Sequence, residues 1–87
     1  MKGGLLENYP NPFNPTTTIS YELSTNGFVS LKVYDALGRE VAALVDETQS
    51  AGVHSVVFDA SRLSSGVYFY RLTAPGINEV KKMLMTK

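Results

Sequence analysis

Cysteine and tryptophan are absent from this 87-residue sequence, and histidine occurs once, as His54. Without cysteine there is no disulfide, no thiolate metal site and no cysteine nucleophile, and the redox compartment stays open. One imidazole alone cannot make the usual zinc site or a catalytic triad. We therefore expect His54 to be an ordinary strand residue.

The sequence also lacks net charge and long apolar runs. Eight basic residues balance eight acidic ones, so no overall field attracts nucleic acid or an anionic membrane. The longest apolar stretches, such as residues 41–45, fall far short of the roughly 20 residues of a membrane span. The first six residues lead directly into Glu7 without a signal-peptide apolar segment. We expect residues 1–4 to be a leading segment or linker and residues 5–87 to form one domain.

What the sequence does contain is apolar residues that recur with a period of two. Hydrophobic residues make up 44% of the chain and charged ones 18%, the balance of a folded domain with one core. Short alternating segments separated by turn residues indicate strands. The predicted fold is all-β, a seven-stranded immunoglobulin-like Greek-key β-sandwich. Its predicted strands are residues 5–9, 16–23, 28–34, 39–45, 53–59, 67–73 and 79–86.

Turn chemistry suggests how these strands are connected. Asn26-Gly27 predicts a hairpin between the strands at residues 16–23 and 28–34. The turn at residues 35–38 can use an Asx bond and a glycine with positive φ, which predicts a second hairpin. Residues 46–52 are expected to form a polar loop.

The second half of the chain alternates less clearly. In residues 53–59 we expect the Val56 and Phe58 face to point inward. Residues 60–66 are too short for a stable helix and predict a crossover loop, with Leu63 reaching the core.

No residue pattern indicates catalysis, a cofactor or a metal site. The carboxylates at turns, Asp35, Asp46, Glu47 and Asp59, are expected to cap local backbone rather than pair as acid and base. They lack the regular spacing of a calcium loop, and no serine lies in a nucleophile elbow. We therefore expect the chain not to be an enzyme.

Two surfaces could carry binding. A carbohydrate platform could use the rings of Phe13, Phe58, Tyr68 and Tyr70, although aromatic residues at period two are more often core or cross-strand pairs. Three lysines, Lys81, Lys82 and Lys87, bracket the apolar residues 83–85. They either guard an exposed edge or mark a strand that a partner extends through main-chain hydrogen bonds.

Three segments, read together, carry a family resemblance: residues 8–17 (NYPNPFNPTT), 33–41 (VYDALGREV) and 66–72 (GVYFYRL). With the ending KKMLMTK, they resemble the type A C-terminal sorting domain of the type IX secretion system of Bacteroidetes. Thr86 stands where another aliphatic residue is common in that family. The same segments also resemble the immunoglobulin-like domain of flagellar hook-capping proteins, but a chain that stops after its last strand favours the sorting signal.

The resemblance implies a secretion signal at the end of a larger exported protein, whose upstream cargo is delivered through the periplasm to the outer-membrane surface or the medium. Its partners would be the outer-membrane translocon and its sorting machinery, and isolated copies could pair through the terminal edge strand. That strand would keep its backbone groups free until a partner arrives. The alternatives are a structural assembly domain of hook-capping type and a carbohydrate-binding module. Recognition would fall on Asn11, Pro12, Phe13, Asp35, Gly38, Arg39, Gly66, Tyr68, Lys82 and Lys87.

Overall fold

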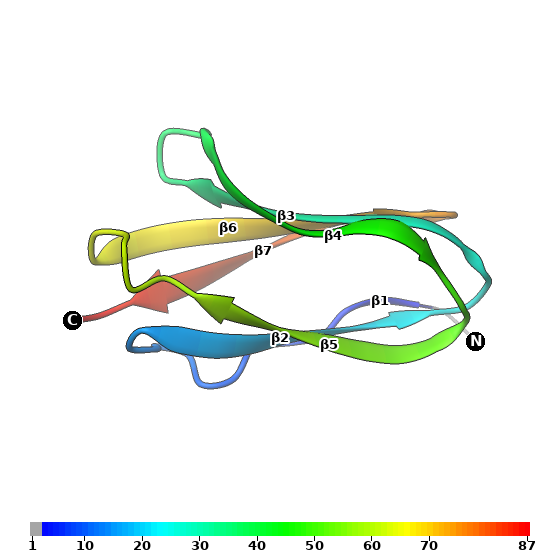
Figure 1. Cartoon of the computed structure of the whole chain (residues 1–87), viewed down its shortest axis with the longest axis horizontal. Helices are drawn as coiled ribbons and strands as arrows, with labels where there is room; N and C mark the ends of the chain where they lie inside the picture. The colour runs from blue at the N-terminus through cyan, green and yellow to red at the C-terminus, as the bar shows by residue number, and fades with distance from the viewer. Residues whose placement is uncertain (1–2) are drawn as a thin grey trace.

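The computed structural model describes residues 3–87, which form seven strands in two antiparallel sheets (Figure 1). The prediction of an all-β, seven-stranded sandwich is confirmed. Gly4 already belongs to the first strand, whereas Met1 and Lys2 lie outside the described residues. The strands are β1 (Gly4–Leu5), β2 (Thr16–Leu23), β3 (Gly27–Asp35), β4 (Glu40–Gln49), β5 (Gly52–Asp59), β6 (Gly66–Ala74) and β7 (Ile77–Met85).

One sheet has the strand order β1-β2-β5 and the other β4-β3-β6-β7. The chain crosses between the sheets after β2, β4 and β5, which gives the Greek-key path. In a constant-type immunoglobulin domain the fourth strand belongs to the first sheet. Here β4 instead pairs with β3, so the sandwich has three strands against four.

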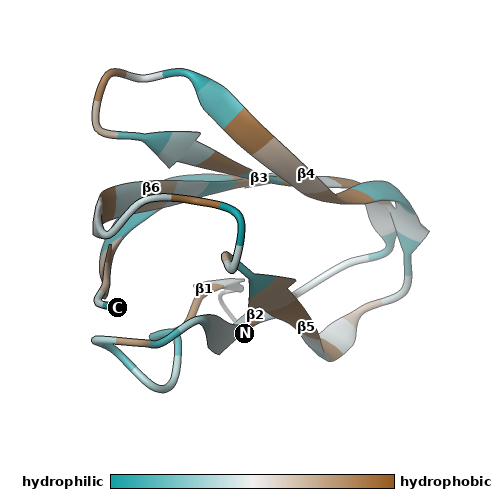
Figure 2. Cartoon of the chain, turned by 60° about the vertical axis from the view of Figure 1, so that its left-hand side comes forward, coloured by the Kyte–Doolittle hydropathy of each residue, from teal (hydrophilic) through white to brown (hydrophobic). Residues whose placement is uncertain are grey.

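The core lies between the two sheets (Figure 2), where the inward residues of the longer strands meet. In β2 every second side chain is buried, as the alternation predicts. Tyr21, Tyr70 and Phe13 are the bulkiest side chains that are fully buried. Aromatic rings therefore supply much of the apolar area that this small domain removes from water.

The predicted hairpin at Asn26-Gly27 is wrong, because β2 and β3 lie in different sheets. Both edges of β2 are already paired, one with β1 and the other with β5, so β3 has no free edge to join. The Asn26 Oδ1 atom instead accepts a hydrogen bond from the Ala51 N–H at 2.8 Å. This bond ties the β2–β3 crossover to the β4–β5 crossover.

The predicted polar loop at residues 46–52 is also wrong, because β4 continues to Gln49. Its polar residues stay paired with β3, for example Glu47 with Val29, while the side chains of residues 46–48 face solvent. Other expectations are confirmed. The turn after Asp35 makes a β3–β4 hairpin, Phe58 is buried, and Leu63 packs partly buried against the core from a loop.

Residues 3–87 contain no helix that could cross a membrane.

Candidate partner-recognition surface

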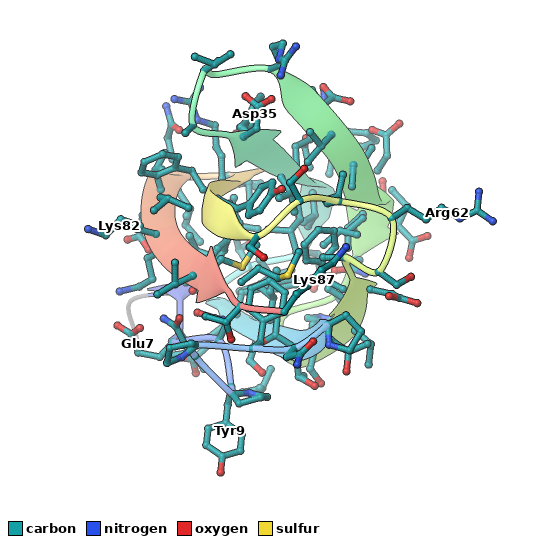
Figure 3. The ribbon with its side chains drawn as sticks, turned by 90° about the vertical axis from the view of Figure 1, so that its left-hand side faces the viewer. Glu7, Tyr9, Asp35, Arg62, Lys82 and Lys87 are labelled. Carbon is teal, nitrogen blue, oxygen red and sulfur yellow. The ribbon has the colours of Figure 1, made fainter. Side chains whose placement is uncertain are left out.

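The three sequence motifs meet at one end of the sandwich, which we call the motif end: residues 10–14, 35–39, 60–66 and 86–87. Strand register brings them together, because Asp35 pairs with Tyr68 and Gly66 pairs with Met85. A bridge from Phe13 to Met85 adds the proline-rich segment. Figure 3 looks onto this end, with Lys87 near the centre of the view and Asp35 toward one margin.

The turn between β3 and β4 is fixed by the Asp35 carboxylate. Its Oδ1 atom accepts hydrogen bonds from the Leu37 N–H at 2.9 Å and the Arg39 N–H at 3.0 Å. Its Oδ2 atom receives the Arg39 Nε–H at 2.8 Å. The backbone bond from Arg39, with the other bonds and charge at this turn, holds the pKa of Asp35 below its usual value. Gly38 takes a φ of 86°, which favours glycine at that position.

This turn presents an ordered cation and an apolar tip. The Arg39 side chain remains 73% exposed although its Nε is bonded, and Leu37 is 79% exposed. An exposed guanidinium whose geometry is already fixed loses less conformational freedom when a partner binds. Arg39 therefore presents an exposed guanidinium whose position is fixed by Asp35.

Two predicted recognition side chains are not on the surface. Phe13 is 1% exposed and packs edge-on against Phe58, with ring centroids 6.1 Å apart. Tyr68 is 6% exposed, and its hydroxyl donates to the Ser64 carbonyl at 2.6 Å. In the folded domain Phe13 therefore offers no exposed surface to a partner, and Tyr68 offers little. Their rings pack in the core beneath the surface of the motif end. Gly66, with a φ of 151°, starts β6 beside them.

The proline-rich segment covers one end of the β7 edge, which corrects the expectation of a free terminal strand. The Phe13 N–H donates to the Leu84 carbonyl at 3.0 Å, and the Thr86 N–H donates to the Phe13 carbonyl at 2.9 Å. The Asn11 Oδ1 atom accepts from the Leu84 N–H at 3.1 Å. Backbone groups near the end of β7 are therefore already satisfied inside the domain. Pro12, which lies between Asn11 and Phe13 in the sequence, is exposed.

The terminal lysines lie in different surroundings. The Lys87 ammonium donates to the Ser61 carbonyl at 3.3 Å, which places it on the loop between β5 and β6. The Lys81 ammonium pairs with Glu7 at 3.2 Å. Lys82 projects from the outer face of β7 and is exposed. Lys87 thus belongs to the motif end, while Lys82 borders it beside Asn11, with which it lines a shallow hollow.

Sequence reasoning missed a buried polar pair under the prolines. The Asn8 amide donates to the Thr17 hydroxyl at 3.1 Å and to the Pro10 carbonyl at 3.3 Å. The same carbonyl accepts from the Thr17 hydroxyl at 2.8 Å. This network holds the proline-rich segment against β2. Its sequence signal was an asparagine two residues before a proline, which alternation of apolar residues does not reveal.

The carbohydrate platform is wrong for the rings on which it was based. Phe13, Phe58, Tyr68 and Tyr70 are all buried in the core. Burial raises the pKa of Tyr70 to about 12, and its hydroxyl donates to the Leu6 carbonyl at 3.1 Å. These rings belong to the core, which was the alternative interpretation of aromatic residues at a period of two.

His54 is held within the sandwich by two contacts. Its ring stacks on Tyr21 with centroids 5.4 Å apart, and its Nε2 atom lies 2.8 Å from the Ser50 carbonyl oxygen. Within residues 3–87, no three histidine, aspartate or glutamate side chains gather as metal ligands would.

Comparison with known proteins found a matching family and a similar solved structure. A family model described as secretion system C-terminal sorting domain matches residues 7–86. Among solved structures the chain is similar to PorZ, an essential bacterial surface component of the type-IX secretion system of Porphyromonas gingivalis. The two chains are 22% identical with a TM-score of 0.66, and the match covers 97% of this chain but 12% of that one. This likeness establishes the fold alone. No curated protein sequence matches the chain.

Proposed function

This chain belongs to the C-terminal sorting domains of the type IX secretion system, and we propose that the outer-membrane translocon reads it, as a folded domain, at the motif end. As a sorting signal it directs a longer protein through the secretion system to the cell surface or the medium.

The observation that carries the proposal is the separation of the two ends of the sandwich. Gly3 lies beside Ser24 at the end opposite the motif end, and Figure 1 shows the C-terminus at the other end of the sandwich. A cargo that precedes the domain would join at Gly3 and leave the motif end uncovered. The same surface could then be read on cargoes of any shape.

The motif end offers the translocon a fixed arrangement of groups rather than a flexible tail. Asp35 orients Arg39, Lys87 is bonded to the β5–β6 loop, and Leu37 is exposed at the tip of the turn. Cations that are partly immobilised before binding suit recognition of carboxylates or other anionic groups on a partner. We propose that Arg39 and Lys87 make such contacts.

The proposal assigns binding, and no catalysis, to this domain. The one histidine is engaged with Tyr21 and Ser50, and the Asp35 carboxylate is engaged with its own turn. Any enzymatic activity would belong to the cargo.

The test uses a fluorescent reporter placed between a signal peptide and residues 5–87, in a bacterium with the type IX machinery. Export is compared with that in a strain lacking the translocon. The double variant Arg39→Ala with Lys87→Ala should lower export at least ten-fold. Its thermal midpoint should stay within a few degrees of the wild-type value, because both side chains are exposed.

The matched control removes two cations elsewhere, with Lys32→Ala and Arg71→Ala on the outer face of the four-stranded sheet. This control should export like the wild type. Equal export by both double variants would contradict recognition at the motif end. Export that does not require the translocon would contradict the choice of partner.

A further inference from the structure

The two sheets leave four edge strands, and three of them carry a recognisable protection against pairing with other chains. β1 has two residues. β4 has two register shifts against β3 and carries the carboxylates of Glu40, Asp46 and Glu47. β7 carries Lys81 and Lys82 and is covered at one end by Asn11 and Phe13. Short length, bulges, charges and covering segments are the usual means of blunting a sheet edge.

β5 is the exception. It is eight residues long, and it pairs with β2 without a register shift. Between Val53 and Val57 it contains no charged residue, no proline and no glycine. Val53 and Val57 are 68% and 64% exposed. A long, regular, uncharged edge rich in β-branched residues is the kind that pairs with another strand.

The hydrogen bonds of β2 show which backbone groups of β5 are free to pair. The carbonyls of Thr18 and Ser20 point away from β5, toward Tyr9 and Leu6. In an antiparallel ladder the direction alternates, so β2 bonds to β5 through its odd-numbered residues, whose partners include His54 and Val56. The N–H and C=O groups of Val53, Ser55 and Val57 therefore point outward, along the open edge.

We propose that β5 is a self-association strand, which pairs antiparallel with β5 of a second copy about a two-fold axis at Ser55. The sequence around that residue is nearly symmetric, Val-His-Ser-Val-Val. In this register Val53 lies opposite Val57 of the second copy, and Ser55 lies opposite Ser55. The three outward residues of each copy exchange about six backbone hydrogen bonds, and the valines form two cross-strand pairs.

Charge supports a second copy as the occupant. In this register Asp59 of one chain lies opposite Ala51 of the other, so no two charged residues of β5 oppose each other. The pairing joins two three-stranded sheets into one of six. The contact is smaller than a standard protein interface of about 1,600 Å², so we expect a dissociation constant of roughly 10 µM to 1 mM.

The test is sedimentation equilibrium of the 87-residue chain up to roughly 2 mM, above the expected dissociation constant. Val57→Lys places a charge opposite Val53 of the second copy and should weaken association at least ten-fold. Ser55→Pro removes an outward N–H but none of the hydrogen bonds to β2, and it should also weaken association at least ten-fold. Circular dichroism and the thermal midpoint verify that both variants fold.

The matched control is Val80→Lys, which puts the same charge on the outer face of β7. Val80 is 47% exposed, so the control should fold and associate like the wild type. A chain that remains monomeric at the highest concentration would overturn the proposal. A dimer that still forms in both β5 variants would also overturn it. The same holds if Val80→Lys abolishes the dimer while Val57→Lys leaves it intact.

Discussion

The two long sides of the sandwich are held in different ways. On the side where β1 and β7 approach, the segment that precedes β2 joins the two sheets. The Leu5 N–H donates to Glu79 Oε1 at 2.7 Å, Glu7 pairs with Lys81, and Phe13 bonds to the backbone at the end of β7. Residues more than 70 positions apart in sequence thereby close this side.

On the side where β4 and β5 approach, polar side chains make the connection. The Tyr21 hydroxyl donates to Gln49 Oε1, and Gln49 Nε2 donates to Glu47 Oε2 at 3.3 Å. His54 bonds to the Ser50 carbonyl within the crossover itself. No backbone ladder joins β4 to β5.

The difference would allow one domain to combine a sealed side with the associating edge that we propose for β5. Backbone bonds and a buried ring close the β1/β7 side, so opening it disrupts the core. A few side-chain bonds hold the β4/β5 side, which leaves the edge of β5 available. Each side can therefore be disturbed without the other.

The largest effect is expected from Phe13→Ala on the β1/β7 side. The ring is 1% exposed and packs against Phe58, so its removal leaves a cavity that the sheets cannot fill. We expect a loss of about 3–5 kcal/mol in the free energy of unfolding, measured by urea denaturation. The matched control is Phe28→Ala, at a ring that is 56% exposed. Similar losses in both variants would show that Phe13 does not close the core.

Alkaline pH should weaken the same side through Tyr70. Burial raises its pKa to about 12, so the folded state holds the phenolic proton more tightly than the unfolded chain, whose tyrosines titrate near 10. The resulting stability is fully present below about pH 10 and is lost as the pH rises toward about 12. Thermal midpoints between these values should fall more steeply for the wild type than for Tyr70→Phe. Parallel pH profiles would argue against this role of Tyr70.

A smaller effect is expected at the covered end of the β7 edge. Asn11→Ala removes the acceptor of the Leu84 N–H and should cost about 1 kcal/mol. Hydrogen exchange at the Leu84 amide should then become faster. Asn14→Ala is the control, because Asn14 is exposed in the same segment. If exchange at Leu84 is unchanged, Asn11 does not protect this edge.

Alternation of apolar residues predicted the six longer strands, but the first strand ends at Leu5 and not at residue 9 as expected. Together with turn chemistry, it identified the strand at residues 16–23 and the turn at Asp35, because burial on one face and turn chemistry are local properties. It could not assign partners. A period of two does not say which strand lies alongside, so β2 and β3 were wrongly joined.

The motif end was predicted only in part, because local sequence patterns do not reveal contacts between distant residues. The motifs named the residues at the motif end, but they did not separate exposed Arg39 from buried Phe13 and Tyr68. Nor could they show that Asn11 covers β7, since an irregular, proline-rich segment has no periodicity to interpret. These contacts depend on residues distant in sequence.

The smallest effect is expected from the polar connection on the β4/β5 side. Tyr21→Phe removes the hydroxyl that Gln49 accepts while the ring keeps its stacking on His54. Gln49 is partly exposed, so water can replace much of the lost bond. A double-mutant cycle of Tyr21→Phe with Gln49→Ala should therefore give a coupling energy of about 0.5 kcal/mol.

A coupling several times larger would mean that this side is sealed as firmly as the other. The contrast between the two sides would then no longer hold, and polar side chains alone would suffice to close a sandwich of this size.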